Sequence, residues 1–420
     1  MSAGDTRNRI DEAKLRDLFN PERVTRLIKI VGPHLAGSRN PVLHIMPLAW
    51  RIGHIAMEPH AIWELYGGEK DRMVLLFPLS SVAPHSRGVR AVIEPHFKIV
   101  ETDEPGIMIM GHVDAGILSQ GGFTWYQRGP AGVLDDYIKL LSHTGRQPRH
   151  MALPPSVRNE VDTFLARLGV GDTDKVVVLN VRDRNYMADQ EVHFYRTADI
   201  ASYETALLHL LDRGYWVLRL GVDGTVPASI KAPRYVEVWK EPDYSDLLDP
   251  GLIARAHFGI TCSSGPEAVF RILGTPQLMV NGVLQCSMWM NPRDRLLFKS
   301  YRTNEGVPAS LPAMLEKGVA IRSDSASVGQ CGFTAQDNTP AEILAAVRDM
   351  EEALGSQPAE ADDLDRRFLE IGCAYQSFLT EIGHPRDPAS LSARPTQFGY
   401  ALPWTRLSAA NQSANPNFLE

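Results

Sequence analysis

The chain has 420 residues, of which 44% are hydrophobic and 22% are charged, a balance typical of a globular protein with two or three domains. The net charge of −7 argues against a protein that binds mainly to the nucleic-acid backbone. Four cysteines without a C-x-x-C pair, a polar N-terminus and the lack of an apolar run of about 20 residues favour a cytoplasmic protein without a membrane span, while peripheral attachment to a membrane stays open.

The first 165 residues predict a helical segment followed by an α/β domain. The apolar spacing over residues 10–31 predicts one or two amphipathic helices within a helical segment 1–38. Helix-like stretches at 54–66 and 133–142 lie among strand-like runs, which predicts an α/β domain over 39–165. The predicted strands lie at 42–45, 73–77, 92–94 and 106–110.

The region 172–355 predicts a second, doubly wound α/β domain. Its first strand, 175–180, is a Val-rich run that suits a strand covered by helices on both faces, as in parallel sheets. Further strands are predicted at 215–220, 235–239, 258–260, 277–280 and 319–321, and helices at 203–214, 249–256, 265–273 and 340–354. The remaining segment, 356–420, predicts a helix over 363–382 and an extended tail from 384, with Trp404 and Phe418 docked on the body.

Three loops follow predicted strands of this second domain, at 180–183, 221–223 and 261–265. Ligands of open α/β sheets bind at the carboxyl ends of the strands. The three loops therefore predict a phosphate or nucleotide site at one edge of the sheet.

The loop 261–267 carries the strongest local signal of the three. Small residues follow the apolar run 258–260 and lead into a predicted helix, whose first N–H groups and dipole would favour an anion such as a diphosphate. Ser264 and Glu267 also have the spacing of a capping box, which needs no ligand. Both interpretations stay open from the sequence.

The order and spacing of several motifs resemble a known family. The motifs lie at 51–56 (Arg-Ile-Gly-His-Ile-Ala), 178–186, 195–203, 213–221 and 263–267. Together they resemble a family of bacterial glycosyltransferases linked to surface-glycan synthesis, and the resemblance covers about residues 40–345. The chain departs from related fucosyltransferase-like enzymes at 183–185, where those enzymes often have Gly-Asp after the Arg, so the nucleotide stays open.

The resemblance implies a GT-B-like fold, in which two Rossmann-like domains face each other across a cleft. It implies transfer of a sugar from a nucleotide-diphosphate sugar, bound by the second domain, to an acceptor bound by the first. The acceptor is a glycan, a lipid-linked molecule or a small molecule, and no metal or other cofactor is expected. Nucleic acid is not an expected partner.

The donor-binding candidates lie in the loops of the second domain. They are Arg182, Asp183, Tyr186, Arg219, Gly221, Ser263, Ser264, Gly265 and Glu267. The planar guanidinium of Arg182 could grip a phosphate with two N–H donors, although a salt bridge with Asp183 would also explain it. Gly221 would let the sheet edge approach a ligand closely, but an ordinary turn glycine fits equally well.

The acceptor side of the site is expected near residue 54. His54 and Glu58 are spaced i, i+4 and therefore share one face of the predicted helix. A histidine there suits a general base that takes a proton from an acceptor hydroxyl, while the alternative is a structural histidine. Arg51 and Gly53 are expected to lie beside them, at the acceptor or cleft.

Two other classes of function stay open. One is a nucleotide-sugar epimerase of the same architecture, which would change the donor without an acceptor. The other is a non-catalytic scaffold that binds a glycan or nucleotide. A dehydrogenase is disfavoured because no G-x-G-x-x-G follows an early strand. The sugar, the base, the acceptor, the stereochemical outcome and the oligomeric state are not determined by the sequence.

Overall fold

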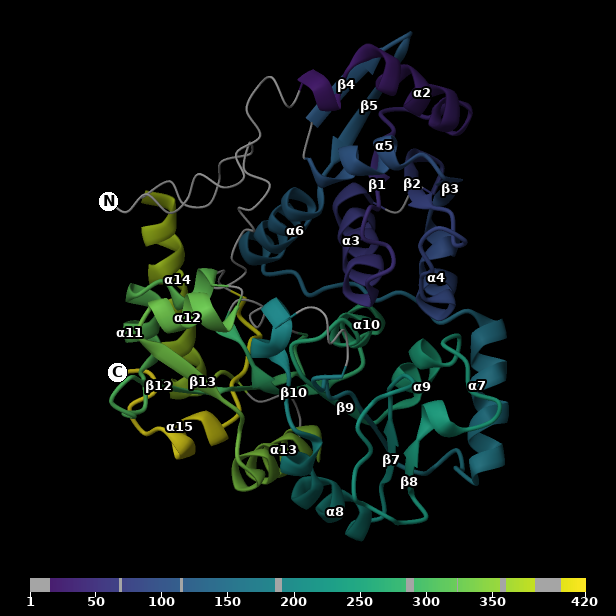
Figure 1. Cartoon of the computed structure of the whole chain (residues 1–420). Coiled ribbons are helices and arrows are strands. Elements are labelled where there is room, and N and C mark those ends of the chain that lie inside the picture. The colour runs from purple at the N-terminus through teal and green to yellow at the C-terminus, as the bar shows by residue number, and fades with distance from the viewer. Residues whose placement is uncertain are drawn as a thin grey trace. The chain divides into compact units, whose positions relative to one another are not determined.

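The computed structural model describes residues 16–67, 70–113, 116–185, 191–284, 291–322, 324–355, 360–381 and 402–420. The chain divides into two compact units (Figure 1). Unit 1 comprises Met1–His143 and Leu379–Pro395, and unit 2 comprises Thr144–Phe378 and Thr396–Glu420. Among the described residues, no helix is both long and apolar enough to cross a membrane.

The first boundary differs from the one expected at residue 165. Helix α7 (Pro155–Leu168) belongs to unit 2, where it packs on α9 (Asp249–Arg255). A Cβ atom at Gly251 would lie only 2.2 Å from Val161 of α7, so the two helices are in close contact. The amphipathic face of α7 is therefore buried by the second unit.

Unit 1 contains a five-stranded sheet of order β3-β2-β1-β5-β4. The strands are β1 (Val42–Ile45), β2 (Met73–Pro78), β3 (Lys98–Thr102), β4 (Gly116–Gln120) and β5 (Phe123–Arg128). All pairings are parallel except that of β4 with β5. The topological switch point lies between β1 and β5. The chain first places β2 and β3 on one side of β1 and then places β4 and β5 on the other side.

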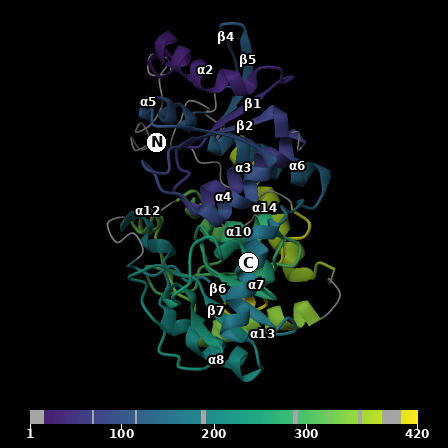
Figure 2. The same cartoon turned by 90° about the vertical axis from the view of Figure 1, so that its right-hand side faces the viewer.

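Helices cover both faces of this sheet. The helices are α2 (Pro21–Leu35), α3 (Ile52–Tyr66), α4 (Arg87–Ile93), α5 (Pro105–Met108) and α6 (Pro130–Thr144). Leu43 and Ile45 of β1 share a core cluster with apolar residues of α2. His44 alternates with them and points to the opposite face, where it contacts Glu58 of α3. Helix α4 packs beside α3 (Figures 1 and 2).

Two predicted strands of this unit are wrong. Residues 92–94 end α4 and enter the 3-10 helix η2 (Glu94–His96), and residues 106–110 lie in α5 and the 3-10 helix η3 (Ile109–His112). Val89, Val92 and Ile93 bury one face of a helix, because their spacing follows the helical repeat. The strands β3, β4 and β5 were not predicted, and β4 is an edge strand with only partly buried and exposed positions.

Unit 2 contains a six-stranded sheet of order β11-β10-β9-β6-β7-β8. The strands are β6 (Val176–Leu179), β7 (Trp216–Arg219), β8 (Tyr235–Glu237), β9 (Phe258–Thr261), β10 (Gln277–Gly282) and β11 (Arg295–Phe298). All of its pairings are parallel. This is the 3-2-1-4-5-6 order of Rossmann domains, so the predicted doubly wound fold is confirmed.

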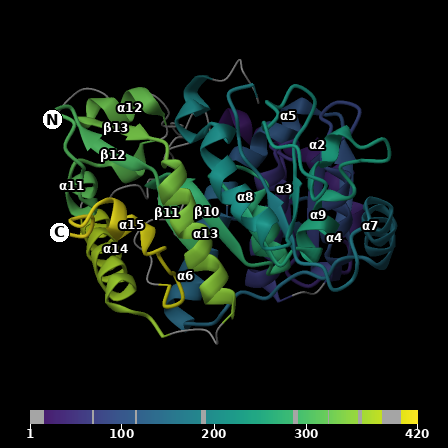
Figure 3. The same cartoon turned by 90° about the horizontal axis from the view of Figure 1, so that it is seen from below.

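The sheet of unit 2 is covered on both faces. Helices α8 (Glu204–Asp212) and α13 (Pro340–Gly355) lie side by side over one face (Figure 3). Gly259 faces the other way, where a Cβ atom would lie 2.1 Å from Phe270 of α10 (Glu267–Leu273). Helix α13 begins with a capping box, because Thr339 N–H donates to Glu342 Oε2 at 2.6 Å and Glu342 N–H donates to Thr339 Oγ1 at 3.3 Å.

The last strand of the sheet is β11, and the strand predicted at 319–321 is wrong. Val319–Ile321 forms the 3-10 helix η8 within an insertion between β11 and α13. The insertion also contains β12 (Ser300–Thr303), α11 (Leu311–Glu316), α12 (Ser325–Gln330) and β13 (Phe333–Gln336). Strands β12 and β13 pair antiparallel as a separate two-stranded sheet.

The C-terminal segment packs on unit 2. Helix α14 spans Asp363–Glu381, close to the predicted bounds. Trp404 and Phe418 are buried, as expected, and the carbonyl of Phe418 accepts a hydrogen bond from Leu311 N–H at 2.6 Å. The expected extended tail instead contains a short helix, α15 (Ala410–Ala414), within its described part.

Candidate functional site

The carboxyl edge of the unit 2 sheet brings the three predicted loops together. The switch point lies between β6 and β9, because the chain adds β7 and β8 on one side of β6 and then β9 to β11 on the other. Arg182 N–H donates to Cys262 Sγ at 3.3 Å, which joins the loops after β6 and β9. Asp183 Oδ2 accepts from Val226 N–H at 2.8 Å, which joins the loop after β7. Ligands of such sheets bind at this position.

Three cationic side chains gather at the switch point. Arg182 is only 6% exposed and Lys299 only 5%. Burial raises the pKa of the Cys262 thiol, whereas the Arg182 N–H bond and the charges of Arg182, Lys299 and Arg196 lower it. The three cations are therefore close enough to act on one thiol.

Asp183 orders the loops around Arg182. Its Oδ1 accepts from Asn185 N–H at 2.9 Å, and its Oδ2 holds Val226. The carboxylate is therefore occupied by backbone donors on both oxygens. Tyr186, another candidate for donor binding, lies outside the described residues.

The turn 261–267 does not form the capping box that its spacing allowed. Helix α10 begins at Glu267 with Pro266 at the N-cap and no side-chain cap, so it is shorter than predicted. Ser263 Oγ accepts from Val283 N–H at 3.1 Å and is thus committed to the end of β10. The Ser264 hydroxyl has no hydrogen-bond partner among the described residues, and Gly265 follows it. These two residues leave polar groups for a ligand.

Glu267 belongs to a buried polar network beneath the turn. It pairs with Arg271 at 2.6 Å, and burial raises its pKa to about 7, against the lowering effect of Arg271. Burial also raises the pKa of Asp294 to about 7, and its oxygens accept from the N–H groups of Gln277 at 3.0 Å and Asn291 at 2.8 Å. This network stabilises the turn from inside, so Glu267 is better explained as a support than as a ligand contact.

Arg219 and Gly221 support the rim of the sheet. Arg219 is fully buried, donates to the Val226 carbonyl at 2.7 Å and pairs with Glu237 at 3.0 Å. Its guanidinium also lies 5.3 Å from the centre of the Trp239 ring. A Cβ atom at Gly221 would lie 2.5 Å from the same ring, so the glycine makes room for Trp239.

We expect Gly221→Ala to destabilise unit 2 by about 1–3 kcal/mol, because the added methyl group must displace a packed ring. The free energy of unfolding measured with a denaturant would show this loss. Gly329→Ala is the matched control, since a Cβ atom there, in helix α12, meets nothing within 4 Å. Equal stability of the two variants would contradict the packing role of Gly221.

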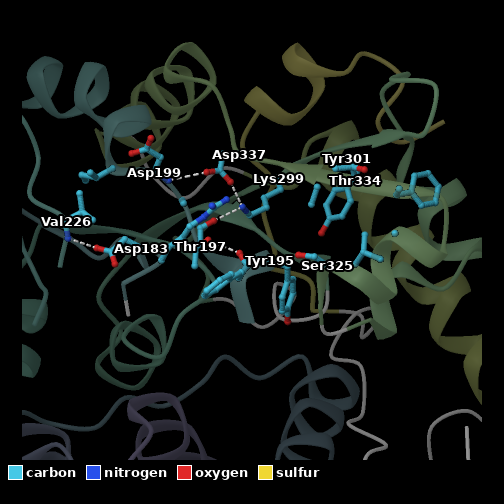
Figure 4. Close-up of a pocket in the computed structure, with 18 residues that line it drawn as sticks. Asp183, Tyr195, Thr197, Asp199, Val226, Lys299, Tyr301, Ser325, Thr334 and Asp337 are labelled. Atoms are coloured by element: carbon cyan, nitrogen blue, oxygen red, sulfur yellow. Dashed lines mark hydrogen bonds and ion pairs between the residues drawn. The ribbon is translucent and has the colours of Figure 1, made fainter. Parts of the chain in front are cut away.

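A pocket of about 570 Å³ opens next to Asp183 (Figure 4). Its walls come from residues 183–184, residues 194–200, the paired strands β12 and β13, and α12. Lys299 donates to the Thr197 carbonyl at 2.8 Å and pairs with Asp337, which also accepts from Asp199 N–H at 3.2 Å. Aromatic side chains complete the lining, namely Phe194, Tyr195, Tyr301 and Phe333. The volume and the mixed lining suit a small-molecule ligand.

Unit 1 has its own cluster at the corresponding edge. His44 of β1 hydrogen-bonds through Nδ1 to the Arg128 carbonyl of β5 at 2.9 Å, so the cluster lies at the switch point of this sheet. His44 Nε2 lies 2.6 Å from Glu58 Oε2. The other oxygen, Oε1, hydrogen-bonds to His54 Nδ1, one helical turn away. His54 and Glu58, which were predicted to share one face of the helix, are thus in contact.

Glu58 is a buried carboxylate held between two histidines. Its side chain is 1% exposed, whereas that of His54 is 28% exposed. Burial raises the pKa of Glu58, but the charges and hydrogen bonds of His54 and His44 outweigh burial and lower it to about 2. Glu58 therefore stays ionised at neutral pH and orients His54, which reaches the surface.

Arg51 and Gly53 lie at the start of α3, beside His54. Arg51 is the N-cap residue of the helix, and its guanidinium lies 4.7 Å from the centre of the Trp50 ring. In the part of the chain that the structure describes, no three His, Cys, Asp or Glu side chains gather as a metal site would require.

Three residues of these sites were not predicted. Lys299 directly follows β11. If β11 had been predicted, the position of Lys299 at the carboxyl end of a strand would have marked it as a candidate. Arg196 ends the 3-10 helix η4 (Glu191–Arg196) and lies in the motif 195–203, but it follows no predicted strand that would have marked it as a site residue. His44 lies inside an apolar strand, where a lone histidine gives no indication of its partner.

Comparisons with known proteins give a distant likeness. No known protein family matches the chain in sequence, and no curated protein does. A glycosyl transferase family 9 structure from Veillonella parvula DSM 2008 is 12% identical with a TM-score of 0.37, over 58% of this chain and 80% of that one. The dodecameric iron-containing heptosyltransferase TibC, in complex with ADP-D-β-D-heptose, is 12% identical with a TM-score of 0.37, over 76% of this chain and 78% of that one.

Proposed function

We propose that the protein is a GT-B-type glycosyltransferase that moves a sugar from a nucleotide-diphosphate sugar to an acceptor. The observation that carries the proposal is the cationic cluster of Arg182, Arg196 and Lys299 at the switch point of a Rossmann-ordered sheet. The motifs at 51–56, 178–186 and 263–267, which resemble surface-glycan glycosyltransferases, support it.

The chemistry of transfer explains the need for positive charge. A diphosphate gains negative charge as its bond to the sugar breaks, and preorganised cations in a dry site stabilise that charge strongly. Lys299 pairs with Asp337. Arg182 and Arg196 are the main candidates for phosphate contact, because a guanidinium can grip a phosphate with two N–H donors. In this proposal these side chains, rather than a metal ion, supply the positive charge.

The nucleoside and the sugar of the donor have room beside the diphosphate. The pocket begins at Asp183, one residue after Arg182, and is large enough for the nucleoside or the sugar of the donor. Its aromatic walls can stack on a base or a sugar ring. The Ser264 hydroxyl and the Gly265 N–H are proposed to contact the diphosphate from the turn after β9.

The acceptor is proposed to bind to unit 1. His54, oriented by Glu58, would take the proton of an acceptor hydroxyl as general base. A glycan, a lipid-linked molecule or a small molecule can supply that hydroxyl. We place the reaction in the cytoplasm, where nucleotide sugars would be available to a protein with reduced thiols.

The proposal is tested first by thermal unfolding of the purified protein with UDP, GDP, CDP, CMP and dTDP, and with NAD as a control, with and without magnesium. A ligand that binds only the folded state stabilises it by about 2.7 kcal/mol at a hundredfold excess over its Kd. We expect one nucleotide to raise Tm without magnesium, and Arg182→Ala to abolish the effect.

The control variant is Arg213→Ala, which removes an arginine that is 59% exposed and paired with Glu351. It should keep the nucleotide effect. No shift with any nucleotide would contradict the proposal and favour a scaffold. A donor sugar that is converted without an acceptor would instead identify an epimerase.

A further inference from the structure

We propose that His44 is a positioning residue for the general base. It would hold Glu58 as a carboxylate, and Glu58 would in turn keep the proton of His54 on Nδ1, so that Nε2 can accept a proton. The use of Nε2 in sugar transfer rests on the proposed function, whereas the protonation pattern does not.

The inner half of the cluster fixes the protons of His44. The Arg128 carbonyl can only accept, so His44 Nδ1, 2.9 Å away, must donate. One further proton lies between His44 Nε2 and Glu58 Oε2, which are 2.6 Å apart. With that proton on nitrogen, the pair is an imidazolium and a carboxylate. Both side chains are at most 1% exposed, and a buried carboxylate needs such a partner.

The outer half of the cluster fixes the tautomer of His54. A carboxylate oxygen accepts, so His54 Nδ1 donates to Glu58 Oε1. The tautomer of a histidine is set by the bond that one of its nitrogens makes. Neutral His54 therefore carries its proton on Nδ1, and its Nε2 lone pair belongs to a side chain that is 28% exposed.

The other charged groups around α3 pair with other residues or have a smaller effect on the protonation of the cluster. Arg128 of β5 pairs with Asp136 at 2.6 Å, and Arg90 of α4 pairs with Glu101. The strand β2 has no ionisable side chain. His112 of η3 is also a neighbour of the cluster: burial lowers its pKa, the charge of Glu58 raises it and the charge of His54 lowers it.

Two further basic side chains belong to the same surroundings. Arg87 lies in the first turn of α4, which packs on α3, and Arg51 stacks on Trp50 at the start of α3. The charges that act on the Glu58 carboxylate come from His54 and His44. The protonation pattern is thus set within the cluster.

The transfer step balances with these protons in place. The acceptor hydroxyl gives its proton to His54 Nε2 while its oxygen bonds to the anomeric carbon. The bond from that carbon to the diphosphate oxygen breaks, and the diphosphate leaves with the electron pair. Glu58 and His44 keep their protonation states and stabilise the new His54 imidazolium.

The test is ¹⁵N NMR of the full chain with labelled histidines at neutral pH, which reports the protonation of each ring nitrogen. We expect His44 to be protonated on both nitrogens and His54 on Nδ1 alone. In Glu58→Gln and in His44→Gln, His54 should lose its fixed Nδ1–H form. His209→Gln, which breaks a histidine–carboxylate pair of 2.8 Å in unit 2, should leave the His54 signals unchanged.

A wild-type protein with His44 protonated on one nitrogen, or with His54 protonated on Nε2, would overturn the inference even if the variants fail to fold. Unchanged His54 signals in both folded variants would overturn it as well. If the protein transfers no sugar but shows the expected signals, the proposed function fails and the inference on protonation stands. If it is an active transferase, His44→Gln should lower kcat by about tenfold or more while leaving donor Kd unchanged.

Discussion

Arg182→Ala is expected to lower the rate of sugar transfer by about 100-fold or more and to weaken donor binding. The guanidinium is nearly buried at the switch point, in a loop tied to the β9 turn through Cys262 and to residues 194–198 through Ala198. These bonds fix the backbone of Arg182, and its planar guanidinium can meet a phosphate with two N–H groups. Arg182→Lys keeps the charge but loses the fork, so its rate should lie between those of the wild type and Arg182→Ala.

The measurement is steady-state kinetics of transfer, with donor Kd determined by titration. Because Arg182 is buried, the unfolding free energy of each variant must be measured in parallel, so that loss of activity is not confused with loss of folding. Arg213→Ala serves as the control for removal of one positive charge from unit 2. Unchanged donor affinity and turnover in a folded Arg182→Ala variant would show that the donor binds elsewhere.

His54→Ala is expected to lower kcat by about 10² to 10⁴-fold, the usual contribution of a general base. Donor Kd should stay the same, because His54 belongs to unit 1 and the donor is proposed to bind to unit 2. Glu58→Gln keeps the size of the side chain but removes the charge that orients and stabilises His54. Its kcat should therefore fall in the same direction.

Single-turnover measurement with saturating donor would separate the chemical step from binding for these variants. His209→Ala is a suitable control, because His209 pairs with Glu351 in unit 2 and the proposed base belongs to unit 1. Full activity of His54→Ala would place the base on another residue of unit 1 and reduce the histidine cluster to a structural role.

The predicted donor residues fall into two groups once their contacts are known. The first group is committed to backbone N–H groups, neighbouring strands, an ion pair or a packed ring, and consists of Asp183, Ser263, Glu267, Arg219 and Gly221. Tyr186 lies outside the described residues. Arg182, Ser264 and Gly265 remain as the candidates for direct contact with the donor, with Arg196 added by the structure. The turn 263–267 therefore contains both residues that stabilise the site and residues whose polar groups can contact a donor.

The sequence by itself determined most of the second sheet and the position of its carboxyl edge. Buried parallel strands are continuous apolar runs, so β6, β7, β9 and β10 could be located from composition, and the polar residues that follow them mark the carboxyl ends. The contact of His54 with Glu58 could also be predicted, because a spacing of four places both on one face of a helix.

Only the tertiary structure decided which distant residues complete these sites. Lys299 lies with Arg182 and Arg196 because β11, a strand that was not predicted, ends beside the segment 197–199. The capping box formed at Thr339 but not at Ser264, where Ser263 is bonded to the end of β10 and Glu267 to Arg271. His44 and Glu58 are paired through a sheet and a helix that pack face to face. Local spacing fixes contacts within one element, whereas contacts between elements depend on packing and on strand order.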